Sequence, residues 1–133
     1  MPEEPFVFID RSLGRIKVPE LLRAGGIKLV TLAEHYGRPL DEDVNDPTWI
    51  TDASQEDWIL FMKDARIRRR PAEKEAIISS RARCFCLSDG NIGFAEMAHR
   101  YLTNWRAIVE ASAIPGPFLY SVRLRGIVRL DVL

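Results

Sequence analysis

The sequence predicts an α/β fold in a single domain over residues 1–133, with a small, mainly parallel central sheet, flanking helices and a C-terminal β-hairpin. Three observations lead to this prediction. Short apolar runs alternate along the chain with segments of helical periodicity. The first strand, helix and strand all fall within residues 6–32, as in a βαβ unit with parallel strands. The chain of 133 residues has the length of one domain and can bury a hydrophobic core.

The first βαβ unit is the clearest part of the pattern. Residues 6–9 are apolar and favour a buried strand, which stops at Asp10. Apolar side chains at helical spacing follow over residues 16–22, and two glycines then end the predicted helix. Residues 27–32 predict the second strand. Residues 33–45 are polar and are predicted to form a loop.

Two more helix–strand pairs follow. Asp46 is predicted to cap a helix whose first residue is Pro47, because a side-chain acceptor followed by proline is a typical helix start. That helix leads into a strand over residues 58–62. A helix over residues 71–80 then leads into a strand over residues 82–87.

The strand over residues 82–87 contains the two cysteines, Cys84 and Cys86. Neighbours two apart on a strand cannot form an unstrained disulfide, so both are predicted to be core residues with free thiols. Because Arg83 and Phe85 alternate with the cysteines, one face of this strand is expected to be less buried.

The last part of the chain predicts one long helix over residues 91–111 and then a hairpin formed by residues 118–122 and 127–132. The aliphatic C-terminus, residues 130–133, has two open roles. It packs either against the core or in a homodimer.

The composition is that of a globular protein, with 47% hydrophobic and 29% charged residues and a formal net charge of zero. No apolar run approaches the length of a membrane helix, and the N-terminus has no apolar signal region. We therefore expect a soluble, cytoplasmic protein with no membrane partner. Within the neutral total, residues 34–57 carry eight acids and residues 63–83 carry eight bases, and this asymmetry indicates a functional site.

Three acidic residues follow or precede predicted strands at positions that could meet. Asp10 follows the first strand, Asp64 follows the third, and Asp46 starts the helix that leads into the third. Ligands of parallel sheets collect at the carboxyl ends of strands, so we expect these three carboxylates to bind one divalent cation, Mg²⁺ or Mn²⁺. Such a cation activates water and neutralises charge on a phosphodiester. Asp89, after the fourth strand, is a further candidate.

A basic run follows Asp64 directly. Arginine side chains suit phosphate oxygens and could position a nucleic-acid backbone without reading its sequence. The alternative is a solvated surface that pairs with Glu73 and Glu75. The predicted RNA contacts are Arg11, Lys63, Arg66, Arg68, Arg69 and Arg70.

Three segments carry a resemblance to a known family. They are residues 8–14 (FIDRSLG), residues 46–50 (DPTWI) and residues 58–71 (WILFMKDARIRRRP), of which the last is the most specific. Together they resemble the compact, three-layer PIN-like domain of VapC-type toxins, and the likeness runs from Phe6 to the hairpin around Gly126.

The resemblance implies a Mg²⁺- or Mn²⁺-dependent endoribonuclease, the toxin of a VapBC-type toxin–antitoxin pair, with RNA as substrate and a cognate antitoxin protein as partner. It assigns the metal-binding and catalytic acids to Asp10, Asp46 and Asp64. Ser12 stands where an amide or acid would be the better ligand, and Glu34 is the candidate for a fourth acid of the family.

Two other functions remain as alternatives. The chain could be a PIN-like module that binds nucleic acid or protein with weak or no catalysis. A phosphatase with Asp10 as nucleophile would need an acid two residues later, where this chain has Ser12.

Overall fold

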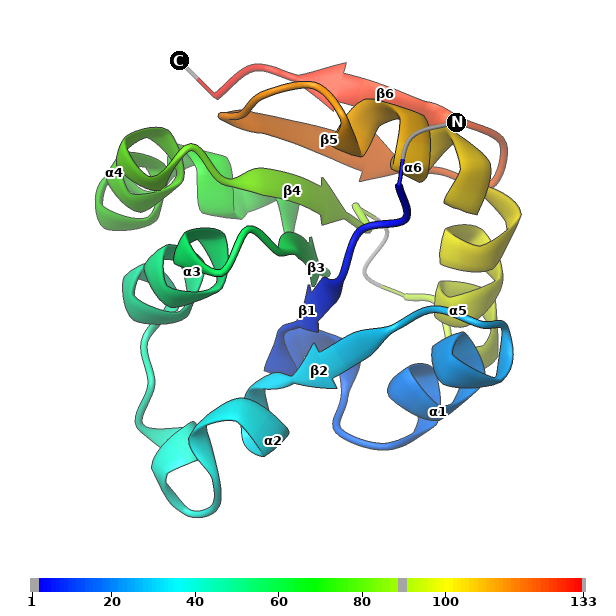
Figure 1. Cartoon of the computed structure of the whole chain (residues 1–133), viewed down its shortest axis with the longest axis horizontal. Coiled ribbons are helices and arrows are strands. Elements are labelled where there is room, and N and C mark those ends of the chain that lie inside the picture. Colours follow the sequence, from blue (N-terminus) through cyan, green and yellow to red (C-terminus); the bar gives the residue numbers. More distant parts are fainter. Residues whose placement is uncertain (1–2, 89–90, 133) are drawn as a thin grey trace.

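The computed structural model describes residues 3–88 and 91–132. Within these residues six strands form one sheet in the order β2-β1-β3-β4-β5-β6 (Figure 1). Strands β1 to β5 all run parallel to one another. Strand β6 is antiparallel to β5, and both features agree with the sequence prediction. The strands are β1 (Val7–Ile9), β2 (Leu29–Thr31), β3 (Ile59–Met62), β4 (Arg83–Cys86), β5 (Phe118–Val122) and β6 (Ile127–Leu130).

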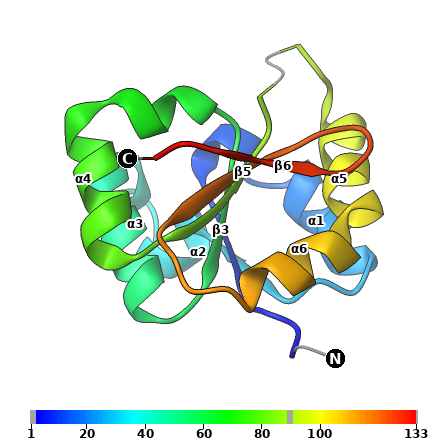
Figure 2. The same cartoon turned by 90° about the horizontal axis from the view of Figure 1, so that it is seen from above.

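Helices cover both faces of the sheet and give three layers. Helices α3 and α4 lie on one face, and α1, α5 and α6 lie on the other (Figures 1 and 2). The helices are α1 (Lys17–Ala24), α2 (Leu32–Tyr36), α3 (Asp46–Gln55), α4 (Pro71–Ser80), α5 (Phe94–Thr103) and α6 (Trp105–Ser112), with 3₁₀ turns η1 (Arg11–Leu13), η2 (Leu40–Glu42) and η3 (Ala65–Arg69). No helix among the described residues is long and apolar enough to span a membrane.

Side chains alternate across the strands and so divide the core in two. Ile59 and Phe61 of β3 pack on the α1/α5/α6 face, whereas Leu60 packs on the α3/α4 face. The Phe61 ring stacks on Tyr101 of α5 with 3.9 Å between ring centroids. The buried Tyr101 hydroxyl donates to the carbonyl of Met62 at 3.1 Å, so α5 is attached to the carboxyl end of β3.

The prediction that one face of β4 is less buried is wrong. Phe85 is fully buried, and Arg83 is half-buried. Helices on both faces of the sheet remove the less buried face that the sequence suggested, because parallel sheets are normally covered on both sides. Cys84 and Cys86 are buried free cysteines, as predicted.

Residues 33–45 do not form a loop throughout. They contain α2 and η2. Helix α2 begins after Thr31, whose hydroxyl accepts from the Glu34 N–H at 3.1 Å while the Glu34 side chain accepts from the Thr31 N–H at 2.9 Å. This reciprocal capping stabilises a helix too short for apolar periodicity to reveal.

Two helix boundaries also differ from the prediction. Asn45, not Asp46, caps α3, since its side chain accepts from the Thr48 N–H at 2.9 Å. The predicted helix over residues 91–111 is two helices, α5 and α6, that meet at Asn104. Asn104 uses its side-chain amide on other backbone groups, which interrupts the helix.

The C-terminal residues that the structure describes pack against the protein's own core. Val132 is buried and Leu130 is half-buried, and both lie in the α3/α4 core. Arg68 donates to the carbonyl of Asp131 at 3.0 Å and holds the segment there. Of the two roles left open for this segment, core packing is therefore the one observed.

Candidate active site

Two of the predicted acids follow adjacent parallel strands. Strand β1 pairs with β3 so that Ile9 lies opposite Phe61. The Asp10 N–H continues this ladder by donating to the Phe61 carbonyl at 3.0 Å. Asp10 therefore sits at the carboxyl edge of the sheet, one strand away from the end of β3 and from Asp64.

Asp10 is a buried carboxylate with an unused oxygen. The residue as a whole is only 6% exposed to solvent. Oδ2 accepts from the Ser12 N–H at 3.2 Å, whereas Oδ1 is buried and has no hydrogen-bond partner among residues 3–88 and 91–132. Burial raises the pKa of Asp10, and the nearby negative charge of Asp46 raises it further, while hydrogen bonding from Ser12 acts in the opposite direction. A cation at this point would relieve both unfavourable effects.

Asp46 reaches the same edge from the first turn of α3. Its Oδ1 accepts from the Trp49 indole N–H at 2.8 Å, and Trp49 is fully buried. This bond gives the carboxylate a defined position, and its charge acts on Asp10. Asp46 is near enough to Asp10 for its charge to raise the Asp10 pKa, and a metal site shared by the two carboxylates stays a prediction.

Asp64 lies in different surroundings. Its side chain is 35% exposed and forms ion pairs with Arg66 at 3.0 Å and with Arg70 at 3.3 Å. The hydrogen bond from Arg66 is the main cause that lowers the pKa of Asp64. Within residues 3–88 and 91–132, no group of three acidic, histidine or cysteine side chains is placed to hold one metal ion. The three-carboxylate site stays a prediction, and Asp89 lies outside the described residues.

A hollow opens at the carboxyl edge of the sheet, and of the three predicted acids Asp64 lines it. It has a volume of about 520 Å³ and is lined by Ser12, Lys63, Asp64, Ala65, Arg66 and Ser88. Ser12 joins its two sides, because its hydroxyl accepts from the Lys63 N–H at 3.0 Å while its own N–H binds Asp10. We call this the catalytic hollow. Ser12 has a positioning role that was missed, because the hydroxyl and Lys63 are far apart in the sequence.

The predicted basic residues divide into three groups. Arg11 and Arg68 hold the backbone: Arg11 donates to the carbonyls of Asp41, Glu42 and Val44, and Arg68 to that of Asp131. Arg66 and Arg70 pair with Asp64. Lys63 and Arg69 make no side-chain hydrogen bond or ion pair with the described residues. Among the residues that the structure describes, neither Glu73 nor Glu75 forms an ion pair with the basic residues at positions 66–70.

Asp41 is a buried acid that sequence reasoning passed over. It is 2% exposed, and its Oδ2 pairs with Arg15 at 2.9 Å. Together with Arg11 this pair holds residues 40–44, the segment that leads to Asp46. Glu34, the candidate fourth acid, instead caps α2 and pairs with Arg23 at 2.7 Å.

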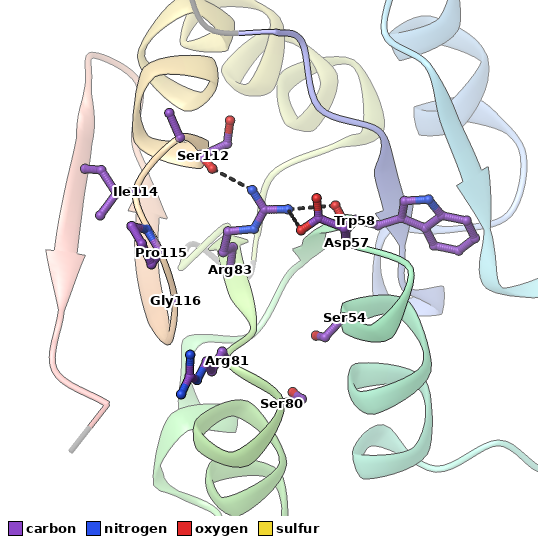
Figure 3. Close-up of a pocket in the computed structure, with 11 residues that line it drawn as sticks. Ser54, Asp57, Trp58, Ser80, Arg81, Arg83, Ser112, Ile114, Pro115 and Gly116 are labelled. Carbon is purple, nitrogen blue, oxygen red and sulfur yellow. Dashed lines mark hydrogen bonds and ion pairs between the residues drawn. The ribbon is translucent and has the colours of Figure 1, made fainter.

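A further hollow lies at the opposite, amino end of β4 and contains none of the predicted site residues (Figure 3). Arg83 points into it and donates to the carbonyls of Ser112 and Asp57. The Arg83 guanidinium also forms an ion pair with the Asp57 carboxylate at 3.1 Å. Its charge is therefore used to join the ends of neighbouring elements.

Comparisons with known proteins agree with this arrangement. The family model described as "PIN like domain" matches residues 5–89, which include Asp10, Asp46 and Asp64. A protein named as ribonuclease VapC45, from Mycobacterium tuberculosis, is 42% identical over 124 residues, which cover 93% of this chain and 90% of that protein. No solved structure matches the chain.

Proposed function

Because this chain belongs to the PIN-like domain family, we propose that it is a ribonuclease that hydrolyses RNA phosphodiester bonds with a divalent cation, as the toxin of a VapBC-type toxin–antitoxin pair. The observation that carries the proposal is the Asp10 carboxylate. It is buried at the carboxyl edge of the sheet and feels the charge of Asp46, and no group in the described part of the chain donates to one of its oxygens. A buried carboxylate in this state is costly unless a ligand completes it.

The residues present fit a hard divalent cation, Mg²⁺ or Mn²⁺. Mg²⁺ is commonly held by one or two carboxylates and keeps several waters, and Asp10 with Asp46 supplies such a pair. When bound, the cation supplies an activated water and neutralises charge on the phosphate. Asp64 is proposed as the third ligand, which requires that it exchange Arg66 and Arg70 for the cation.

The protein's own groups have separate tasks in this proposal. Ser12 holds Asp10 through its N–H and fixes the backbone of Lys63 through its hydroxyl. Lys63 and Arg66 line the catalytic hollow and attract the RNA phosphate. Arg69 and Arg70 extend the positive charge beside it. Arg11 and Arg68 are left out of the RNA-contact set, because they hold the backbone.

RNA cleavage in the presence of Mn²⁺, Mg²⁺ or EDTA tests the proposal. We expect Asp10→Asn, Asp46→Asn and Asp64→Asn each to lower the cleavage rate by at least about 100-fold, because each removes a proposed ligand. Asp43→Asn is the matched control, since Asp43 is exposed and lies just before the same helix. Cleavage that persists in EDTA, or in Asp10→Asn, would overturn the proposal.

Partner and compartment follow from the same proposal. A toxin of this kind would be masked by a cognate antitoxin protein. The cytoplasm fits an RNA substrate and two free cysteines. We also propose that residues 1–133 form one PIN-like domain, because both cores use opposite faces of the same sheet.

One observation favours a second candidate, a PIN-like module that binds RNA without cleaving it. The Asp64 carboxylate is already neutralised by Arg66 and Arg70. In that case RNA binding would be equal in EDTA and Mn²⁺, and no cleavage product would form.

A further inference from the structure

A second hollow adjoins the catalytic hollow along the carboxyl edge of the sheet. It has a volume of about 290 Å³ and is lined by Ser88, Arg100, Ser121, Val122, Arg123 and Leu124. Ser88 lines both hollows, and its hydroxyl lies 2.7 Å from that of Ser121. We call this second space the flanking hollow. A ligand strand that occupied the catalytic hollow could therefore continue past Ser88 into the flanking hollow.

The turn between β5 and β6 forms one wall of the flanking hollow and lies beside α5 (Figure 2). Asn104, which is buried, holds this turn at two points. Its side-chain amide donates to the Arg123 carbonyl at 2.7 Å, and its Oδ1 accepts from the Gly126 N–H at 2.8 Å. The Arg123 N–H in turn donates to the Gly126 carbonyl at 3.0 Å. Arg123 and Leu124 are thus presented by a fixed backbone.

The lining of the flanking hollow favours an anion. It contains two arginines, two serines and two aliphatic side chains, and no acidic side chain among the described residues. The hollow of Figure 3 is different, because Asp57 lines it beside its arginines. Arg100 pairs with Glu96 at 3.2 Å, so it is not assigned to the ligand. Arg123 is exposed, and no described residue neutralises it.

An apolar group accompanies this charge. Leu124 is 50% exposed at the wall of the flanking hollow. A cation next to an exposed apolar surface matches the chemistry of a nucleotide, which combines a phosphate with a ribose and a flat base.

We propose that the flanking hollow binds the nucleotide next to the scissile bond of single-stranded RNA, with the Arg123 guanidinium on its phosphate and Leu124 against its base or ribose. This inference rests on the proposed ribonuclease function. Arg123 is a substrate-binding residue here, and Asn104 is the positioning residue that holds its backbone.

The test is the binding of a short, fluorescently labelled single-stranded RNA to the full chain in EDTA, measured by anisotropy over a series of salt concentrations. Arg123→Ala should weaken binding about five-fold and reduce the slope of log K against log salt by about 0.7, the value for one phosphate contact on a single strand. Leu124→Ala should weaken binding without changing the slope. Arg125→Ala is the control, because it removes the same charge from the same turn but does not line the hollow.

The outcomes separate this inference from the proposed function. If the wild-type chain binds and cleaves RNA but Arg123→Ala binds as the wild type does, the flanking hollow is not a subsite and the ribonuclease proposal stands. An equal loss in Arg125→Ala would also overturn the inference, because the turn would then act only through its total charge. If the wild-type chain neither binds nor cleaves RNA, both proposals fail.

Discussion

Asp10 and Asp64 follow neighbouring parallel strands, yet their carboxylates lie in opposite surroundings. Asp10 is almost fully buried, one of its oxygens has no partner among the residues that the structure describes, and its pKa is raised by burial. Asp64 is partly exposed and bound by Arg66 and Arg70, and its pKa is lowered. The comparison shows that a position at a strand end does not set the direction in which the pKa of an acid shifts. The groups around the carboxylate do.

The contrast also suggests different contributions to the free energy of unfolding. An ionised, incompletely satisfied Asp10 opposes folding, whereas an arginine-bound Asp64 favours it. If the site binds a cation, the free energy of Asp10 in the folded state is the one that the ligand lowers most.

Metal binding should separate the two acids most strongly. Mn²⁺ at about 100 times its Kd should raise the Tm of the wild-type chain by about 10 °C, because a ligand of the folded state stabilises it by mass action. Asp10→Asn should abolish this rise, and Asp64→Asn should reduce it by less. Thermal unfolding with Mn²⁺ or EDTA measures the effect. A rise that survives Asp10→Asn but is lost in Asp64→Asn would reverse the two roles.

Without metal, Asp10→Asn should stabilise the protein by about 1 kcal/mol at neutral pH, because it removes a buried charge at a functional site. The sign follows from the pKa. Since the folded-state pKa of Asp10 is raised above 3.8, the cost of ionising it is absent below pH 3.8 and grows as the pH rises through the folded pKa. Urea unfolding in EDTA at low and neutral pH should show the gain at neutral pH alone. Asp43→Asn serves as the control, and a loss of stability in Asp10→Asn would contradict the assignment.

Asp64→Asn should give the smallest effect, a destabilisation below about 1 kcal/mol at neutral pH, because its ion pairs are partly exposed and screened by solvent. The folded-state pKa of Asp64 lies below 3.8, so its contribution is present above pH 3.8 and is lost as the pH falls through the folded pKa. Urea unfolding at low and high salt should show the difference shrinking with salt. The Asp64 side chain also caps η3 by accepting from the Arg66 N–H at 2.9 Å. A larger or salt-independent loss of stability would mean that this cap contributes more than the ion pairs.

The sequence predicted much of the fold for identifiable reasons. The bounds of α4, residues 71–80, agree with the structure because proline is favoured at the first position of a helix, where Pro71 stands. The hairpin of β5 and β6 was likewise visible in its alternation. Helix α2 was missed because its stability comes from the Thr31–Glu34 capping box and not from periodicity.

The site was predictable in part. Asp10 and Asp46 were expected at one edge because strand ends and helix starts share an edge in parallel sheets, and the charge of Asp46 does act on the pKa of Asp10. The use of Arg11 to hold residues 41–44 could not be predicted, because the arginine and its carbonyl partners are about 30 positions apart. Nothing local distinguishes an arginine that binds backbone from one that is free for RNA.

Local chemistry in the sequence, meaning residue type, apolar period and turn signals, determined the strand–helix order, the parallel sheet and the positions of Asp10 and Asp64 directly after their strands. Only the tertiary structure decided which oxygen of Asp10 is left without a partner, which arginines are engaged, and that Asn104 ends one helix to hold a distant turn. The physical reason is range. Periodicity and propensity act over a few residues, whereas burial and hydrogen-bond pairing depend on neighbours that folding brings together from far along the chain.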